Sequence, residues 1–146
     1  MTRPPQPTAR LRFTRVENER YTASSSVHEA VQSRSGPGPV LILHVRGQVI
    51  VVDEASIDWI DGAGNYVRLH AGHERHRVRG TLKDLEGVLP PRFVRSHRST
   101  IMNVGAVQEF VRTPFGDIIA VLRTGDRLTV GRTYRRNVEA AFAVRL

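Results

Sequence analysis

The sequence predicts a mainly β domain of short antiparallel strands, with one short helix and a C-terminal helical segment. Two observations carry this prediction. Short apolar runs recur between residues 39 and 130, and turns that contain glycine separate them, which is typical of antiparallel sheets. From residue 39 onward, apolar residues take helical spacing in two segments, 81–89 and 133–144.

The first predicted strands are Val40–Val45 and Gln48–Val52, with Arg46 and Gly47 as the turn between them. Glycines permit positive φ, so we also expect a turn at Asp61–Gly64. The remaining predicted strands are Ser56–Asp61, Asn65–His70, Glu74–Arg79, Ala106–Arg112, Asp117–Leu122 and Arg127–Val130.

The helix at 81–89 has Thr81 as its expected N-cap, and Pro90 and Pro91 stop it. Leu82, Leu85 and Leu89 would form its buried face. The second helical segment would close the domain.

Residues 1–38 are predicted to be a flexible basic arm, and residues 39–146 a single folded domain. The arm is rich in proline and serine, and such a composition cannot bury enough surface to offset backbone entropy. It carries six arginines and three acids, which leaves 16 basic and 11 acidic residues for the domain. Both parts are therefore basic.

The whole chain of 146 residues has a formal charge of +8, and 21 of its 22 basic residues are arginine. Arginine binds phosphate and guanine through two hydrogen bonds, so the positive charge of the chain favours nucleic acid as a partner. The chain has no cysteine, which excludes disulfides and thiolate metal sites. It also lacks a long apolar run and a secretory leader, so we expect a cytoplasmic protein that does not enter the membrane.

The stretch Arg92–Asn103 is the main candidate site. It is too polar for a core strand and too apolar for a disordered tail. Phe93 and Ile101 could anchor it to a core, while arginine and asparagine suit base edges and serine and histidine reach phosphate. Its candidate nucleic-acid contacts are Arg95, His97, Arg98, Ser99 and Asn103. The alternative is a loop whose polar groups satisfy the protein itself.

A second basic group follows the last predicted strand and contains Arg132, Thr133 and Arg135. At a junction between a strand and a helix it would offer backbone N–H groups and guanidinium groups to phosphate. A solvated helix face is the alternative.

His70, His73 and His76 recur at every third residue and raise the question of a metal site. A hairpin would separate the three rings, so we prefer exposed histidines and expect no metal or other cofactor. His97 beside Ser96 and Ser99 is the one grouping that suggests catalysis. Neighbours on a strand point to opposite faces, so we expect no enzyme.

Several ordered motifs resemble the LytTR-type DNA-binding domain, and together they cover roughly residues 39–142. The motifs are Ile57-Asp58-Trp59-Ile60, Gly64-Asn65-Tyr66-Val67-Arg68-Leu69, Val78-Arg79-Gly80-Thr81-Leu82, Phe93-Val94-Arg95-Ser96-His97-Arg98-Ser99-Thr100-Ile101-Met102-Asn103 and Leu128-Thr129-Val130-Gly131-Arg132. The pattern F-x-R-x-H-R-S-x-I-x-N is specific to that family.

The resemblance implies an elongated, mostly β domain whose loops enter successive major grooves at direct repeats and bend the duplex. Carried over by position, it implies DNA contacts from Asn65, from His97 and Arg98, and from Arg132 or Thr133. Family members commonly have serine followed by arginines where this chain has Gly131-Arg132-Thr133. Most also place a receiver domain or membrane helices before this module, so we expect a regulator that lacks a receiver.

The sequence thus predicts a bacterial transcription regulator that binds double-stranded DNA at paired direct repeats, either alone or as a homodimer on DNA. The alternative is a protein-interaction or sensory module that uses the same fold to hold a regulatory protein partner. RNA is disfavoured, because the few aromatic residues form no interleaved stacking platform.

Overall fold

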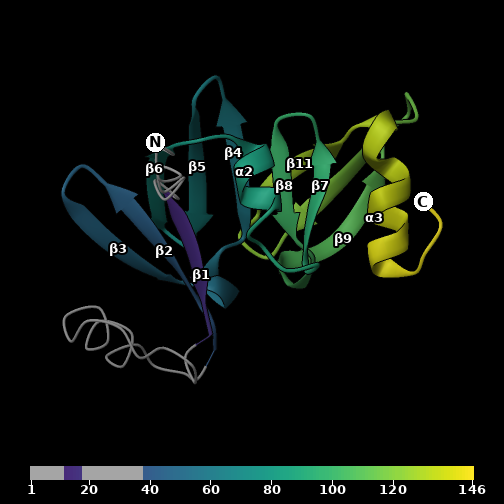
Figure 1. Ribbon diagram of the computed structural model, residues 1–146. Coiled ribbons are helices and arrows are strands. Elements are labelled where there is room, and N and C mark those ends of the chain that lie inside the picture. The colour runs from purple at the N-terminus through teal and green to yellow at the C-terminus, as the bar shows by residue number, and fades with distance from the viewer. Residues whose placement is uncertain (1–11, 18–37) are drawn as a thin grey trace, which may run out of the picture. The chain divides into compact units, whose positions relative to one another are not determined.

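The computed structural model describes residues 12–17 and 38–146, and its strands pair in antiparallel sheets (Figure 1). Contacts between residues divide the chain into two compact units, Met1–Glu54 and Ala55–Leu146. The predicted fold class is confirmed: short antiparallel strands dominate, and one short helix and a C-terminal helix accompany them. The predicted domain boundary between residues 38 and 39 stays a prediction.

The described part of the first unit is a three-stranded sheet in the order β1-β2-β3. The strands β2 (Val40–Val45) and β3 (Gln48–Asp53) form the predicted hairpin. At their turn, Arg46 and Gly47 both have positive φ, 30° and 73°. Glycine adopts this conformation freely, which explains its place at the turn.

The strand β1 (Phe13–Val16) lies inside the segment that the composition predicts to be a flexible arm. For these four residues that prediction is wrong, because Phe13 is buried and the strand pairs with β2. Arg15 also donates from Nε to the buried carboxylate of Glu54 at 2.5 Å. The rest of the predicted arm, residues 1–11 and 18–37, lies outside the described residues.

The second unit begins with a five-stranded sheet in the order β6-β5-β4-β8-β7. Every pair of neighbours is antiparallel, and the two strands in the middle, β4 and β8, come from distant parts of the sequence. The strands are β4 (Trp59–Ala63), β5 (Tyr66–Ala71), β6 (Glu74–Arg79), β7 (Phe93–His97) and β8 (Thr100–Asn103). A 3-10 turn, η2 (Glu54–Ser56), precedes β4.

The polar stretch Arg92–Asn103 forms the β7–β8 hairpin, so the expectation that it is too polar for a core strand was wrong. All four residues of β8 are buried, and so is Ser96 in β7. The Asn103 side chain is satisfied inside the domain by Ile57 O and the Gly105 N–H. The Ser96 hydroxyl is buried and finds no hydrogen-bond partner among the described residues. Only Arg98 and Ser99 remain as the turn.

Helix α2 (Leu82–Glu86) is shorter than predicted but has the expected N-cap. Thr81 Oγ1 accepts from the Asp84 N–H and Asp84 Oδ2 accepts from the Thr81 N–H, each at 3.1 Å. The helix packs over Gly62, where an added β-carbon would lie only 2.8 Å from Leu82 Cγ. Gly62 is therefore a strand residue at a close approach, whereas the predicted turn needs only Gly64.

The remaining strands form a second sheet in the order β11-β10-β9, at or near their predicted positions. The chain closes with helix α3, whose Val138 is fully buried in the core between the two sheets. The elements are η3 (Val104–Ala106), β9 (Val107–Arg112), β10 (Ile118–Leu122), β11 (Arg127–Val130), η4 (Arg132–Tyr134) and α3 (Arg135–Phe142).

Candidate nucleic-acid interface

Three segments predicted to carry the site lie at the same end of the second unit. They are the β4–β5 turn, the β7–β8 turn and the junction between β11 and α3. Gly62 N–H, in β4 just before the first turn, donates to Ser99 O in the second turn at 3.0 Å. Gly131 N–H donates to Ser96 O at 2.8 Å, which joins the second to the third. Figure 1 shows the β4–β5 and β7–β8 turns at the upper edge of the sheet.

Asn65 occupies the tip of the β4–β5 turn and is exposed. Gly64 before it has φ of 62°, which tightens the turn. The Asn65 carbonyl accepts from the Gly80 N–H at 2.6 Å, so the end of β6 braces this turn. The backbone is therefore held while the side-chain amide faces outward with both donor and acceptor groups.

His97, the last residue of β7, is half-buried beside the β7–β8 turn, and Arg98 in the turn is exposed. His97 Nδ1 lies 2.9 Å from Ser99 Oγ and accepts from the Ser99 N–H at 3.2 Å. Because Nδ1 accepts there, a neutral ring would carry its proton on Nε2 and keep that nitrogen as a donor. Arg98 is exposed at the tip, so its guanidinium is free to approach a ligand.

Arg95, predicted as a DNA contact, is occupied by the protein itself. Its guanidinium donates to His97 O at 2.9 Å, to Arg98 O at 2.5 Å and to Glu86 Oε1 at 2.6 Å. It also lies 5.7 Å from the ring centre of Tyr134. We therefore correct its assignment: Arg95 ties the β7–β8 turn to α2 and η4 and holds the turn in shape.

Asn103 was wrongly predicted as a DNA contact, because its side chain is only 1% exposed. Its Nδ2 donates to Ile57 O at 2.8 Å, and its Oδ1 accepts from the Gly105 N–H at 2.9 Å. Both ends of the amide are therefore used inside the domain. The residue fixes the start of β4 against the end of β8.

At the third segment Arg132 and Thr133 are exposed on η4, as the prediction requires. Arg135 is half-buried and one of its Nη atoms donates to the Leu146 carbonyl, and its DNA contact stays a prediction. Gly131 packs against His97: an added β-carbon would lie 3.3 Å from His97 Cδ2. Sequence reasoning missed this contact, because no local pattern places Gly131 beside the histidine.

The three histidines considered as metal ligands do not converge. His70 Nε2 lies 2.8 Å from Asp61 Oδ1, and its ring stacks on Trp59 at 3.9 Å. His76 lies on the opposite face of the sheet, and His73 is in the β5–β6 turn. The histidines therefore serve separate local structures.

Asp61 joins β4 to β5 through Arg68 and His70. Burial alone would disfavour its charged form, but the hydrogen bonds from Arg68 and His70 outweigh burial and hold the pKa of Asp61 below its ordinary value. Asp61 is therefore a carboxylate at neutral pH.

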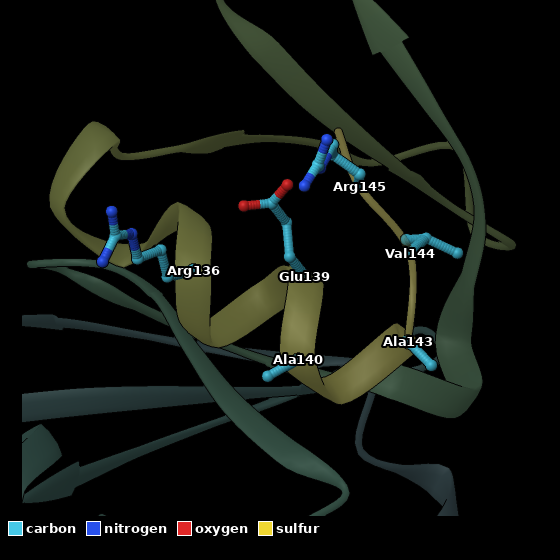
Figure 2. A pocket seen from close by; sticks show the side chains of 6 residues that line it. All are labelled: Arg136, Glu139, Ala140, Ala143, Val144 and Arg145. Carbon is cyan, nitrogen blue, oxygen red and sulfur yellow. The ribbon is translucent and has the colours of Figure 1, made fainter.

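Figure 2 shows a shallow hollow of about 490 Å³ beside α3. Arg136, Glu139 and Ala140 project from the helix, and Ala143, Val144 and Arg145 come from the chain after it. Glu139 already accepts from the Leu146 N–H at 2.8 Å. The hollow is open and lacks the enclosed apolar walls of a small-molecule site.

Within residues 12–17 and 38–146, no helix has the length and apolar character needed to span a membrane.

Comparisons with known proteins agree with this geometry. The family model of the LytTr DNA-binding domain matches residues 47–143. A solved LytTr DNA-binding domain from Bacillus cereus is similar at 20% identity, with a TM-score of 0.62 over 70% of this chain and 95% of that chain. No curated protein matches the sequence. Because the family model covers more than half of the sequence, the chain belongs to the LytTR family, whose domain binds DNA and regulates transcription.

Proposed function

We propose that this protein is a bacterial transcription regulator that reads a specific duplex with the three turns at one end of its second unit. The observation that carries the proposal is the pair of backbone hydrogen bonds, Gly62 to Ser99 and Gly131 to Ser96. These bonds join the end of β4 to the β7–β8 turn and β7 to the junction after β11, so the three turns lie at one end of the unit. A rigid array of this kind can present several side chains to one duplex without reorganising.

The base-reading residues would be Asn65, His97 and Arg98, with Arg132 and Thr133 at the third turn. Asparagine pairs with adenine and arginine with guanine in the major groove, while the His97 Nε2 proton suits a guanine acceptor or a phosphate. As the family resemblance implies, the turns would enter successive grooves of a bent duplex that carries direct repeats. Two copies of the chain would then occupy paired repeats, and they would act in the cytoplasm, where bacterial DNA lies.

The decisive experiment selects genomic fragments bound by the purified full chain and sequences them. A repeated motif, spaced by about one helical turn, is the expected result. Recovered fragments without any shared motif would overturn sequence-specific regulation, and co-purification of one protein without any duplex shift would favour the interaction-module alternative.

A binding comparison then assigns the base-reading role. Arg98→Ala should weaken binding to the selected operator by about 5- to 150-fold, the equivalent of about 1–3 kcal/mol for a bidentate contact, with a smaller loss on random duplex. Equal losses on both duplexes would make Arg98 a phosphate contact instead. Arg127→Ala is a suitable control, because exposed Arg127 begins β11, at the end of the strand opposite Gly131.

A further inference from the structure

A row of arginines lies on one face of the sheet, beside the three turns. The strand β6 is at the edge of the sheet, and its residues Arg75, Arg77 and Arg79 are exposed and alternate along it. Alternate residues of a strand share a face, so the three side chains project together. In β5, Arg68 stands opposite Arg77 and Tyr66 opposite Arg79. We call these five residues the arginine face.

The β9–β11 sheet packs on this same side of the five-stranded sheet, but it covers only the part that lies away from the arginine face. Met102 packs in the core with the β9–β11 sheet, and Trp59 lies against that core and stacks on His70. This stack marks the limit of the covered region. Strands β5 and β6 lie beyond it, on the side of the sheet away from β9–β11 and α3 (Figure 1).

The positive charges of the arginine face are poorly balanced. Its carboxylate, Asp61, lies 2.7 Å from Arg68 and is also bonded to His70. Glu74 alternates with Arg75 and so points to the opposite face, where it lies 3.4 Å from His76. Arg75, Arg77 and Arg79 form no salt bridge with any residue that the structure describes. Three like charges in a row repel one another, and a polyanion would relieve that repulsion.

The arginine face is extended and continuous with the three turns. Arg79 and Tyr66 lie at the same end as Asn65, and Arg75 lies four residues further along β6, or about 13 Å away. A shallow hollow of about 310 Å³ lined by Asp61, Ala63, Tyr66, Arg68 and Arg77 lies between. Arg77 is held over the Tyr66 ring at 4.1 Å. Because the cations spread along a strand and do not converge on a point, the face suits a linear polyanion better than a small anion.

We propose that Arg75, Arg77 and Arg79 bind the phosphates of the duplex outside the region read by the three turns. The proposal rests on the proposed function, because the same duplex must occupy the turns. Such contacts position the protein without reading sequence. They would extend the protected region of the DNA on the β6 side.

The test compares wild type with Arg75→Ala/Arg77→Ala on the selected operator and on random duplex over a range of salt concentrations. Each phosphate that the variant no longer neutralises should reduce the slope of log affinity against log salt by about 0.9, so the double variant should show a slope smaller by up to about 1.8. Affinity should fall by the same factor on both duplexes. Hydroxyl-radical footprinting should show weaker protection only at the flank.

Three further variants test whether the loss of positive charge from the arginine face causes the change in slope. Arg75→Lys/Arg77→Lys keeps the charge and should restore most of the slope. Arg75→Ala alone leaves the Arg77–Tyr66 contact intact and should show about half of the effect. Arg127→Ala/Arg145→Ala removes the same charge at exposed positions away from the arginine face and should leave the slope and the footprint unchanged. Thermal melting should show that all variants fold.

The outcomes separate the two proposals. If Arg75→Ala/Arg77→Ala behaves like the Arg127→Ala/Arg145→Ala control, the arginine face does not contact DNA, whatever Arg98→Ala does. If the slope falls but Arg98→Ala lowers affinity equally on both duplexes, the phosphate contact stands and base reading by Arg98 fails.

Discussion

Asn65 and Asn103 both belong to motifs shared with DNA-binding relatives, yet their side chains face different environments. Asn65 is exposed on a turn, whereas Asn103 bridges Ile57 O and the Gly105 N–H inside the domain. The same residue type therefore serves the ligand at one position and the fold at the other. Burial and hydrogen-bond partners distinguish the two.

Asn103→Ala should lower the free energy of unfolding by about 2–4 kcal/mol, because it leaves a buried carbonyl and a partly buried N–H without partners. Asn65→Ala should change stability by less than about 0.5 kcal/mol but weaken DNA binding. Urea unfolding and duplex titration of both variants check this. Equal stability of the two variants would contradict the structural role of Asn103.

Asp61 gives the stability a defined dependence on pH. Its pKa in the folded state lies below the ordinary value of 3.8 because the hydrogen bonds from Arg68 and His70 outweigh burial. The stabilisation that ionised Asp61 contributes is therefore fully present above pH 3.8. It is lost as the pH falls from 3.8 through the lower pKa of the folded state. Asp61→Asn should be less stable than wild type at pH 6, and this difference should shrink below pH 4. A difference that stays constant from pH 6 to pH 3 would argue against the ionised pair.

At the scale of elements, α2 is positioned by a single close contact with the sheet. Gly62 in β4 leaves room for Leu82, the first residue of the helix. The capping box at Thr81 defines where the helix starts, but Gly62 defines how near the helix lies to the sheet. Since Arg95 donates to Glu86 of the same helix, the position of α2 also affects the β7–β8 turn.

Gly62→Ala should lower the free energy of unfolding by about 1–3 kcal/mol, because the added methyl group meets Leu82 Cγ, which the helix holds in place. Leu82→Ala removes the opposing atoms at the cost of a cavity. In the double variant Gly62→Ala/Leu82→Ala the two destabilising effects should be less than additive, which urea unfolding of all four proteins measures. Full additivity would show that the helix is not held by this contact.

At the scale of the whole molecule, β1 (Phe13–Val16) makes part of the N-terminal segment essential to the first unit. Arg15 reaches the Glu54 carboxylate, which is 1% exposed, and this contact raises the pKa of Arg15. A buried carboxylate without a partner is costly. The ion pair therefore ties a short strand to residues much later in the chain.

Arg15→Ala in the full chain should lower the free energy of unfolding by about 3 kcal/mol, because Glu54 is left buried and unpaired. Arg15→Met/Glu54→Leu removes both charges and should recover much of this stability. Denaturant unfolding of the two variants against wild type gives the comparison. If Arg15→Ala unfolds at the wild-type urea concentration, the Arg15–Glu54 ion pair does not stabilise the unit.

The sequence by itself determined the family of this protein, most of its turns and the strands β2–β6 and β9–β11, but not β1, β7 or β8. These features depend on local chemistry: the two-residue period of strands, the positive φ of Gly47 and Gly64, and the capping box at Thr81 all act over a few residues. The predicted end of β4 was wrong because Gly62 belongs to the strand, where it packs against Leu82, and not to the turn.

Only the tertiary structure decided which polar residues of the candidate site face outward. Asn103 finds its partner Ile57 46 residues away in the sequence, and Arg95 is occupied by Glu86 of another element. The strand order places β4 beside β8 and so brings the β4–β5 and β7–β8 turns to one end of the sheet. Pairing between distant strands has no local signal, which is why sequence motifs could name the turns but not their arrangement.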